Sequence, residues 1–267
     1  LSFQPVEYMK LALAVQLARY FGEHARRRFG WREIIGSGLL TAIPTGLTML
    51  QPDLGSAVLL VGMWLIVMFF AGLRTQHIIT LLISGLIVGV FAWGFFLQDY
   101  QRERLRVFLN PALDPLESGY NITQAKIAIG SGEIFGRGLG FGSQSQLKFL
   151  PESQTDFIFA VIAEELGFLG VLMVLSAFVL LLWRMISIAF HARDNFTSFL
   201  SIAIFAIIFV QMTVNVGVNL AMLPTTGVAL PLVSYGGTSL LMTLVMIGIL
   251  ESIAARTRPG DRLERMV

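Results

Sequence analysis

Seven runs of apolar residues divide the chain, and each is close to the length that crosses a bilayer. A helix needs about 20 residues to cross roughly 30 Å of hydrocarbon. Residues 98–155 form a long polar segment between the fourth and fifth runs. The pattern predicts an all-α fold, a polytopic helical membrane bundle forming one domain over residues 1–267. The predicted spans are 5–21, 34–50, 54–73, 78–97, 157–183, 199–218 and 231–254.

Composition agrees with a membrane location. The chain is 55% hydrophobic and only 13% charged, which is too apolar for an ordinary soluble domain. The absence of cysteine from this sequence excludes disulfides, thiolate nucleophiles and thiolate metal ligands within it. Its net charge of +2 is small, so nucleic acid is not a predicted partner.

Basic residues gather in alternate connections. They lie at 23–32, 72–77, 184–194 and 256–266, which seven spans place on one side of the membrane. Lysine and arginine in short loops mark the cytoplasmic side, and a loop approaching 60 residues is largely exempt from that bias. Residues 98–155 are therefore predicted to be extracytoplasmic.

Asp156 stands where this polar segment meets the fifth run. A carboxylate at the mouth of a membrane helix loses hydration, so it is normally paired, conducting or catalytic. The alternative is a helix cap, because Thr155 and Asp156 precede an apolar run and both residue types suit a first turn. Helical geometry puts Glu164 within reach of the Asp156 face and Glu165 nearly opposite, so at most one of them lines the same cavity.

The first span also carries charge, with Glu7 and Lys10 three residues apart on one helix face. They either neutralise each other as an ion pair, or Lys10 faces an anionic group while Glu7 holds it in place. The outer segment offers further cations, among them Arg106 and Lys126. These suit an anionic substrate or, alternatively, anionic lipid.

Two parts of the outer segment have a recognisable pattern. Ile122, Ala125 and Ile129 predict a short amphipathic helix that lies against the membrane, with Lys126 projecting from it. The glycines of GRGLGFGS, at 136–143, do not follow a dinucleotide or phosphate-binding pattern and predict a pliant loop.

Six stretches of the chain share their residues with one protein family: FQPVEYMKLAL, QPDLGSA, DYQRERL, SGYNITQAKIAIGSG, GFGSQSQLKFLPESQTDFIFAVIAEELG and GVALPLVSYGGTSLL. Together they resemble the RodA/FtsW or SEDS proteins, in family order and over nearly the whole chain. Within that family, QSQLKFLPESQTDF is closest to the RodA elongation branch. Family members have about ten spans, so this chain corresponds to roughly the last seven.

The resemblance implies a peptidoglycan glycosyltransferase that polymerises lipid II at the outer face of the bacterial inner membrane. The family's catalytic aspartate falls on Asp156, which would deprotonate the acceptor hydroxyl. Pyrophosphate leaves as a stable anion, so cations or a divalent metal such as Mg²⁺ or Mn²⁺ can replace a general acid. Glu7 would orient Lys10 or bind the metal. The residues expected at the substrate are Glu7, Lys10, Arg106, Lys126 and Glu164.

The resemblance also implies partners, namely a class B penicillin-binding protein transpeptidase and other proteins of the elongation complex. Two other functions stay open. A lipid II flippase would need a continuous polar path to the cytoplasmic side, for which Gln211, Asn215 and Asn219 on the sixth span are the candidates. A non-catalytic scaffold of the elongation machinery would tolerate loss of Asp156.

Overall fold

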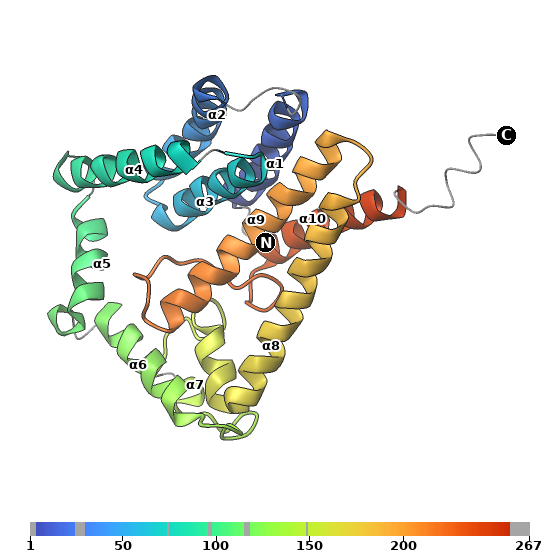
Figure 1. Cartoon of the computed structure of the whole chain (residues 1–267). Helices are drawn as coiled ribbons and strands as arrows, with labels where there is room; N and C mark the ends of the chain where they lie inside the picture. The colour runs from blue at the N-terminus through green and yellow to red at the C-terminus, as the bar shows by residue number, and fades with distance from the viewer. Residues whose placement is uncertain are drawn as a thin grey trace. The chain divides into compact units, whose positions relative to one another are not determined.

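The computed structural model describes residues 4–24, 30–73, 75–95, 98–114, 118–147 and 149–256 (Figure 1). All regular structure in these ranges is helical, as predicted. The α-helices are α1 (Pro5–His24), α2 (Trp31–Leu50), α3 (Leu54–Phe70), α4 (Thr75–Phe95), α5 (Asp99–Leu109), α6 (Ser118–Ser131), α7 (Ser143–Gln146), α8 (Ile158–Phe190), α9 (Asn195–Asn219) and α10 (Gly237–Arg256). A 3₁₀ turn, η1 (Pro111–Leu113), follows α5.

The helices fall into two compact units. Unit 1 comprises 1–77, 179–210 and 237–267, and unit 2 comprises 78–178 and 211–236. The long helices α8 and α9 each contribute residues to both units.

Four helices of the described chain are long and apolar enough to cross a membrane, namely α2, α8, α9 and α10. Helix α3 and residues 76–91 are apolar but shorter. Helix α1 covers the predicted first span and carries Glu7, Lys10, Arg19 and Glu23, which lower its hydropathy. The fold is thus a helical membrane bundle. The basic residues at 25–29 and 257–267 lie outside the described residues.

Unit 1 is built on the buried face of α1. That face repeats every three or four residues, as an amphipathic helix requires, and packs against α2, α3 and α10. Trp64 of α3 donates from its indole nitrogen to the Ser37 hydroxyl of α2 at 2.9 Å, so the one polar atom of this aromatic side chain is satisfied. The buried residues of the face include Leu13, Ala14, Leu17, Ala18 and Phe21.

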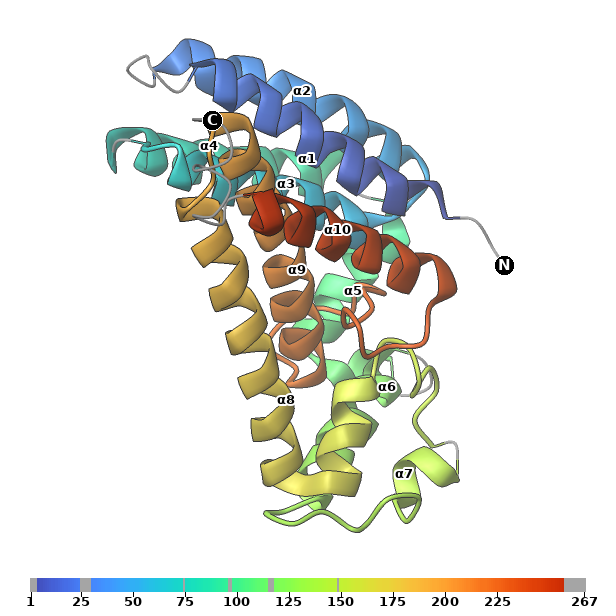
Figure 2. The same cartoon turned by 90° about the vertical axis from the view of Figure 1, so that its right-hand side faces the viewer.

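Unit 2 contains a reversal of the chain that the sequence did not predict. The run 157–183 was expected to form one continuous span, yet Gly167 has φ 66° and ψ −164°, outside the helical region. Figure 2 shows the short first segment of α8 turning back beside the base of its long second segment. A side chain on Gly167 would collide with the backbone at Ile134 and Gly136, so glycine is required here. The continuous part of α8 therefore begins at Phe168.

Two further expectations need correction. The last helix begins at Gly237 rather than near Pro231, because the preceding segment bonds elsewhere: Tyr235 donates its amide to the Gln154 carbonyl at 2.8 Å. The amphipathic helix α6 exists, but its residues Ile122 and Ala125 are buried within the protein at 2% and 0% exposure. The predicted membrane-facing side of α6 therefore packs against protein.

Candidate active site

Asp156 lies in a tight turn just before α8. The amides of Thr155 and Phe157 both donate to the Glu152 carbonyl, at 3.1 and 3.2 Å. Glu152 itself has φ 53°, a left-handed conformation that is uncommon for a residue with a side chain. The turn thus holds Asp156 beside Glu152, and helix α8 begins only after it.

In the structure, another side chain takes the capping role that the sequence suggested for Asp156. The amide of Ala160, in the first turn of α8, donates to Oδ1 of Asn219 at 3.0 Å. An asparagine from α9, distant in sequence, therefore supplies an oxygen to this helix start.

Two asparagines of α9 clamp the Asp156 backbone. The side-chain amides of Asn215 and Asn219 both donate to the Asp156 carbonyl, at 2.9 and 2.8 Å. Asn215 donates in addition to the Val228 carbonyl at 2.8 Å. Both asparagines are buried, with 1% and 0% exposure. We call this set of bonds the asparagine clamp; it ties the Asp156 turn and the Val228 segment to one helix.

The Asp156 side chain lies at a small cavity of about 150 Å³. Arg104 of α5 reaches the same cavity and donates from Nη1 to the Thr225 carbonyl at 3.3 Å. The hydroxyl oxygen of Thr226, also in the lining, is buried and has no hydrogen-bond partner within the described chain. The lining residues are Arg104, Asn121, Glu152, Asp156, Phe157, Val218, Thr225, Thr226, Gly227 and Val228.

The surroundings make Asp156 a stronger base than an ordinary aspartate. Burial raises the pKa of its carboxyl above the usual value, and the neighbouring Glu152 carboxylate raises it further. The Arg104 guanidinium lowers the same pKa, but as a smaller effect. A half-buried carboxylate with a raised pKa is suited to accept a proton.

The predicted cations on α5 and α6 do not line this cavity. Arg106 is exposed and lies two residues beyond Arg104, on a different side of α5. Lys126 is also exposed and lies five residues beyond Asn121, whose side of α6 faces the cavity. The structure therefore brings Arg104 to Asp156, and neither of the two cations chosen from sequence.

Glu164 also differs from its expected place. Its side chain is fully buried and accepts the backbone amides of Gln144 and Ser145, at 2.9 and 3.2 Å, and the Ser143 hydroxyl at 3.4 Å. Glu164 does not line the Asp156 cavity, because α8 begins at Ile158 and turns this carboxylate toward α7. By accepting from these three donors, the Glu164 carboxylate holds the start of α7 in place.

Glu7 and Lys10 form an ion pair inside unit 1. Lys10 Nζ lies 2.8 Å from Glu7 Oε1, and the side chains of Lys10 and Glu7 are only 2% and 6% exposed. The ion pair predicted on one face of α1 is thus present. The residues that line the Asp156 cavity, by contrast, belong to unit 2.

The cavity is a limited match for a divalent metal. It offers two carboxylates, Asp156 and Glu152, together with the guanidinium of Arg104. Among the described residues, no group of three or more histidine, cysteine, aspartate or glutamate side chains could hold an ion. Divalent ions bound by carboxylates usually take more oxygen ligands than two side chains supply. Asp156 and Glu152 would be the ligands if a metal joined the substrate there.

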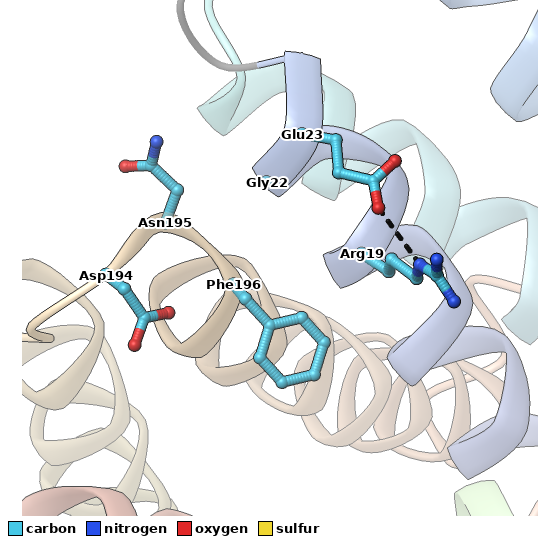
Figure 3. A pocket seen from close by; sticks show the side chains of 6 residues that line it. All are labelled: Arg19, Gly22, Glu23, Asp194, Asn195 and Phe196. Atoms are coloured by element: carbon cyan, nitrogen blue, oxygen red, sulfur yellow. Dashed lines mark hydrogen bonds and ion pairs between the residues drawn. The ribbon is translucent and has the colours of Figure 1, made fainter.

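A second cavity, of about 580 Å³, lies in unit 1 between α1 and the start of α9 (Figure 3). Its charged groups already have partners: Arg19 pairs with Glu23 at 3.0 Å, and Asp194 accepts the Thr197 amide at 2.8 Å as the cap of α9. The Arg19 and Glu23 side chains are 78% and 61% exposed. An exposed, mutually neutralised pair of this kind gives no reactive group, so the Asp156 cavity is the candidate active site.

Comparison with known proteins identifies the class. The family of cell cycle proteins FtsW, RodA and SpoVE matches residues 1–259. The chain belongs to this family.

Two relatives from well-separated bacteria match most of the chain, and one of them is named for an activity. The chain is 42% identical over 256 residues to the peptidoglycan glycosyltransferase MrdB of Escherichia coli, covering 94% of this chain and 68% of MrdB. It is 40% identical over 260 residues to stage V sporulation protein E of Bacillus subtilis, covering 96% and 70%.

Solved structures share the fold. A chain from a peptidoglycan synthase complex that coordinates polymerization and crosslinking superposes with a TM-score of 0.78 at 32% identity, covering 97% of this chain and 72% of that chain. The rod shape determining protein RodA of Thermus thermophilus gives a TM-score of 0.61 at 31% identity, covering 94% and 64%.

Proposed function

We propose that this chain polymerises lipid II into glycan strands and that Asp156 is the general base. Family membership and the activity of the relatives make it a peptidoglycan glycosyltransferase. One observation supports the role of Asp156 above others: its carboxyl has a raised pKa and shares a cavity with the Arg104 guanidinium. A base and a cation in one cavity match a reaction that removes a proton and releases an anion.

In the proposed reaction, Asp156 accepts the proton of the 4-hydroxyl of the acceptor lipid II as that oxygen bonds to the anomeric carbon of the growing strand. The bond from this carbon to pyrophosphate breaks, and the undecaprenyl pyrophosphate leaves with the electron pair. Arg104 is the cation proposed to stabilise the departing charge, because it reaches the cavity that contains Asp156. Arg106 and Lys126, which are exposed, remain proposed contacts to more distant parts of the substrate. Lys10 would become a contact only if its buried pair with Glu7 opened.

Thr226 is a proposed substrate contact as well. Buried polar atoms nearly always have a hydrogen-bond partner, so one without a partner needs an explanation. The Thr226 hydroxyl oxygen is buried in the lining of the active-site cavity and lacks a partner there. A sugar hydroxyl or a water bound with the substrate would satisfy it.

The proposed setting is the bacterial inner membrane, with the Asp156 cavity on the extracytoplasmic face. A related chain belongs to a complex that joins polymerization to crosslinking, which supports a class B penicillin-binding protein as partner during cell elongation. The bonding of Asn215 and Asn219, which were candidates for a polar flippase path, does not support that function. Asn215 and Asn219 are buried and bonded to the Asp156 and Val228 backbone, so their polar groups are already used.

The decisive experiment compares two aspartate-to-asparagine variants in proteoliposomes supplied with lipid II. Asp156→Asn keeps the shape of the side chain but cannot take the proton, so glycan polymerisation should fall about 10²- to 10⁴-fold. Asp194→Asn makes the same change at a carboxylate that caps α9, where asparagine caps equally well, and should retain activity.

Thermal unfolding and lipid II binding would establish that both variants are folded. Near-normal polymerisation by a folded Asp156→Asn protein would remove Asp156 from the mechanism. Normal cell growth on an Asp156→Asn allele with no polymerase activity would favour the scaffold function instead.

A further inference from the structure

The glycine-rich segment predicted to be pliant exposes an unusual number of large apolar side chains. We call residues 132–142 the glycine loop. Four of its side chains are exposed, Ile134 at 57%, Phe135 at 79%, Leu139 at 71% and Phe141 at 78%. Scattered apolar residues on a surface are ordinary, but four within eleven successive positions form a patch, and such patches mark contact with a partner or a membrane.

The loop is fixed in position by the reversal at Gly167. The amide of Phe168 donates to the Glu133 carbonyl at 2.9 Å, and the amide of Leu169 donates to the Ile134 carbonyl at 3.2 Å. In the other direction, Arg137 donates its amide to the Glu164 carbonyl at 3.0 Å. The loop and the reversal therefore form one backbone-bonded element, and its apolar side chains are held outward.

The exposed patch continues onto α8. Phe168, Leu169, Leu172 and Met173 are 60%, 48%, 49% and 74% exposed at the start of the long segment of this helix. Helix α8 is one of the helices long and apolar enough to cross a membrane. Since Phe168 and Leu169 are hydrogen-bonded to the glycine loop, the surface that α8 presents to lipid has no break before it reaches the loop.

The length of α8 sets the depth of the loop. Residues 168–183 are uncharged and are followed by Arg184, which is exposed. At 1.5 Å per residue this uncharged segment is about 24 Å long, shorter than the roughly 30 Å of hydrocarbon that it must cross. With Arg184 at one membrane boundary, the Gly167 end lies about 6 Å short of the opposite boundary, which places the glycine loop in that interfacial region.

We propose that the glycine loop is a membrane-interface anchor, whose apolar side chains insert into the lipid leaflet at the Gly167 end of α8. The occupant is the phospholipid surface, into which interfacial elements sink about 5–10 Å. The exposed Arg137, whose Nε donates to the Ser131 carbonyl at 3.2 Å, lies in the same loop and suits the phosphate level. This assigns the membrane contact to the loop and not to α6, whose apolar side is buried.

Depth-dependent fluorescence quenching tests the proposal in the full-length protein, reconstituted in phospholipid vesicles in a background without other cysteines. An environment-sensitive fluorophore is attached singly after Phe135→Cys, Leu139→Cys or Phe141→Cys. Glu103→Cys on α5 is the aqueous control, and Met173→Cys on α8 is the lipid control; both parent side chains are exposed.

Labels in the loop should be quenched by lipids that carry a nitroxide near the headgroup. The control label at position 173 should likewise be quenched by nitroxide-labelled lipids. Iodide in solution should quench them several-fold less than the label at position 103. Strong iodide quenching without lipid quenching would overturn the proposal, as would shielding that develops only when the partner transpeptidase is added. Three separate positions keep the test decisive if one label prevents folding.

Discussion

The asparagine clamp predicts that a residue outside the cavity controls both stability and turnover. In Asn219→Ala three short bonds disappear: from Nδ2 to the Asp156 carbonyl at 2.8 Å, from Nδ2 to the Asn215 carbonyl at 2.9 Å, and from the Ala160 amide to Oδ1 at 3.0 Å. Each is worth about 0.5–1.5 kcal/mol net. Two of the groups left behind keep a partner, because Asn215 still bonds the Asp156 carbonyl and the Ala160 amide still donates to the Phe157 carbonyl.

The expected loss is therefore near the lower end of the sum, about 2 kcal/mol, which lowers the unfolding midpoint by about 4–8 °C. Turnover should fall by more than the loss of folded protein alone would explain, because a shift of about 1 Å at a catalytic group can cost about 10²-fold in rate. The assay is lipid II polymerisation at a temperature where the variant is fully folded. Ser201→Ala, which removes one buried bond within α9, is the matched control and should keep its activity. Full turnover by folded Asn219→Ala would refute the idea that the clamp positions Asp156.

Two further predictions concern the charges at the cavity and the reversal. Asp156 must be ionised to act, and its pKa is raised, so activity should be lost as pH falls through that raised pKa; Glu152→Gln should move this acidic limb of kcat/KM to lower pH and Arg104→Gln should move it to higher pH. If the acidic limb moved in the same direction in the two variants, the assignment of Asp156 as the titrating group would be contradicted. Gly167→Ala should destabilise the protein by about 1–3 kcal/mol from backbone strain alone, with added collisions, whereas Gly85→Ala on α4 has open space and should be tolerated in the same thermal unfolding assay. Equal stability of the two variants would argue against the reversal.

Hydrophobic runs predicted where helices form, but not their direction. Apart from Glu164 and Glu165, the stretch on both sides of Gly167 is apolar, and a membrane helix tolerates glycine, so a helix ending and restarting there resembles one continuous span. The signal available was Glu165-Leu166-Gly167, a polar helix end followed by a residue able to adopt positive φ. The reversal became evident only from the backbone bonds between residues 133–138 and 164–169.

The sequence did not single out Arg104 as the cation at the Asp156 cavity, for a related reason. Arg102, Arg104 and Arg106 follow one another on alternate positions of one helix, and the sequence alone does not say which side of α5 faces the protein. Asp156 could be proposed from the sequence because its position at the end of a polar segment is a local feature and because it matches the catalytic position of the family it resembles. Its support by Asn215 and Asn219 depends on residues about 60 positions away, which local patterns do not connect.

The Glu7–Lys10 pair gives the last prediction. Both side chains are nearly inaccessible, and removing one partner of such a pair should cost about 3–5 kcal/mol, whereas replacing both by apolar or neutral groups of similar size should be close to neutral. If Lys10 leaves this pair to contact an anionic group of the substrate, Glu7→Gln with Lys10→Met should fold normally while lipid II polymerisation falls at least about tenfold, as for loss of a charged substrate contact. Lys10→Met alone should lose as much activity and more stability. Wild-type turnover by the stable double variant would make the pair purely structural.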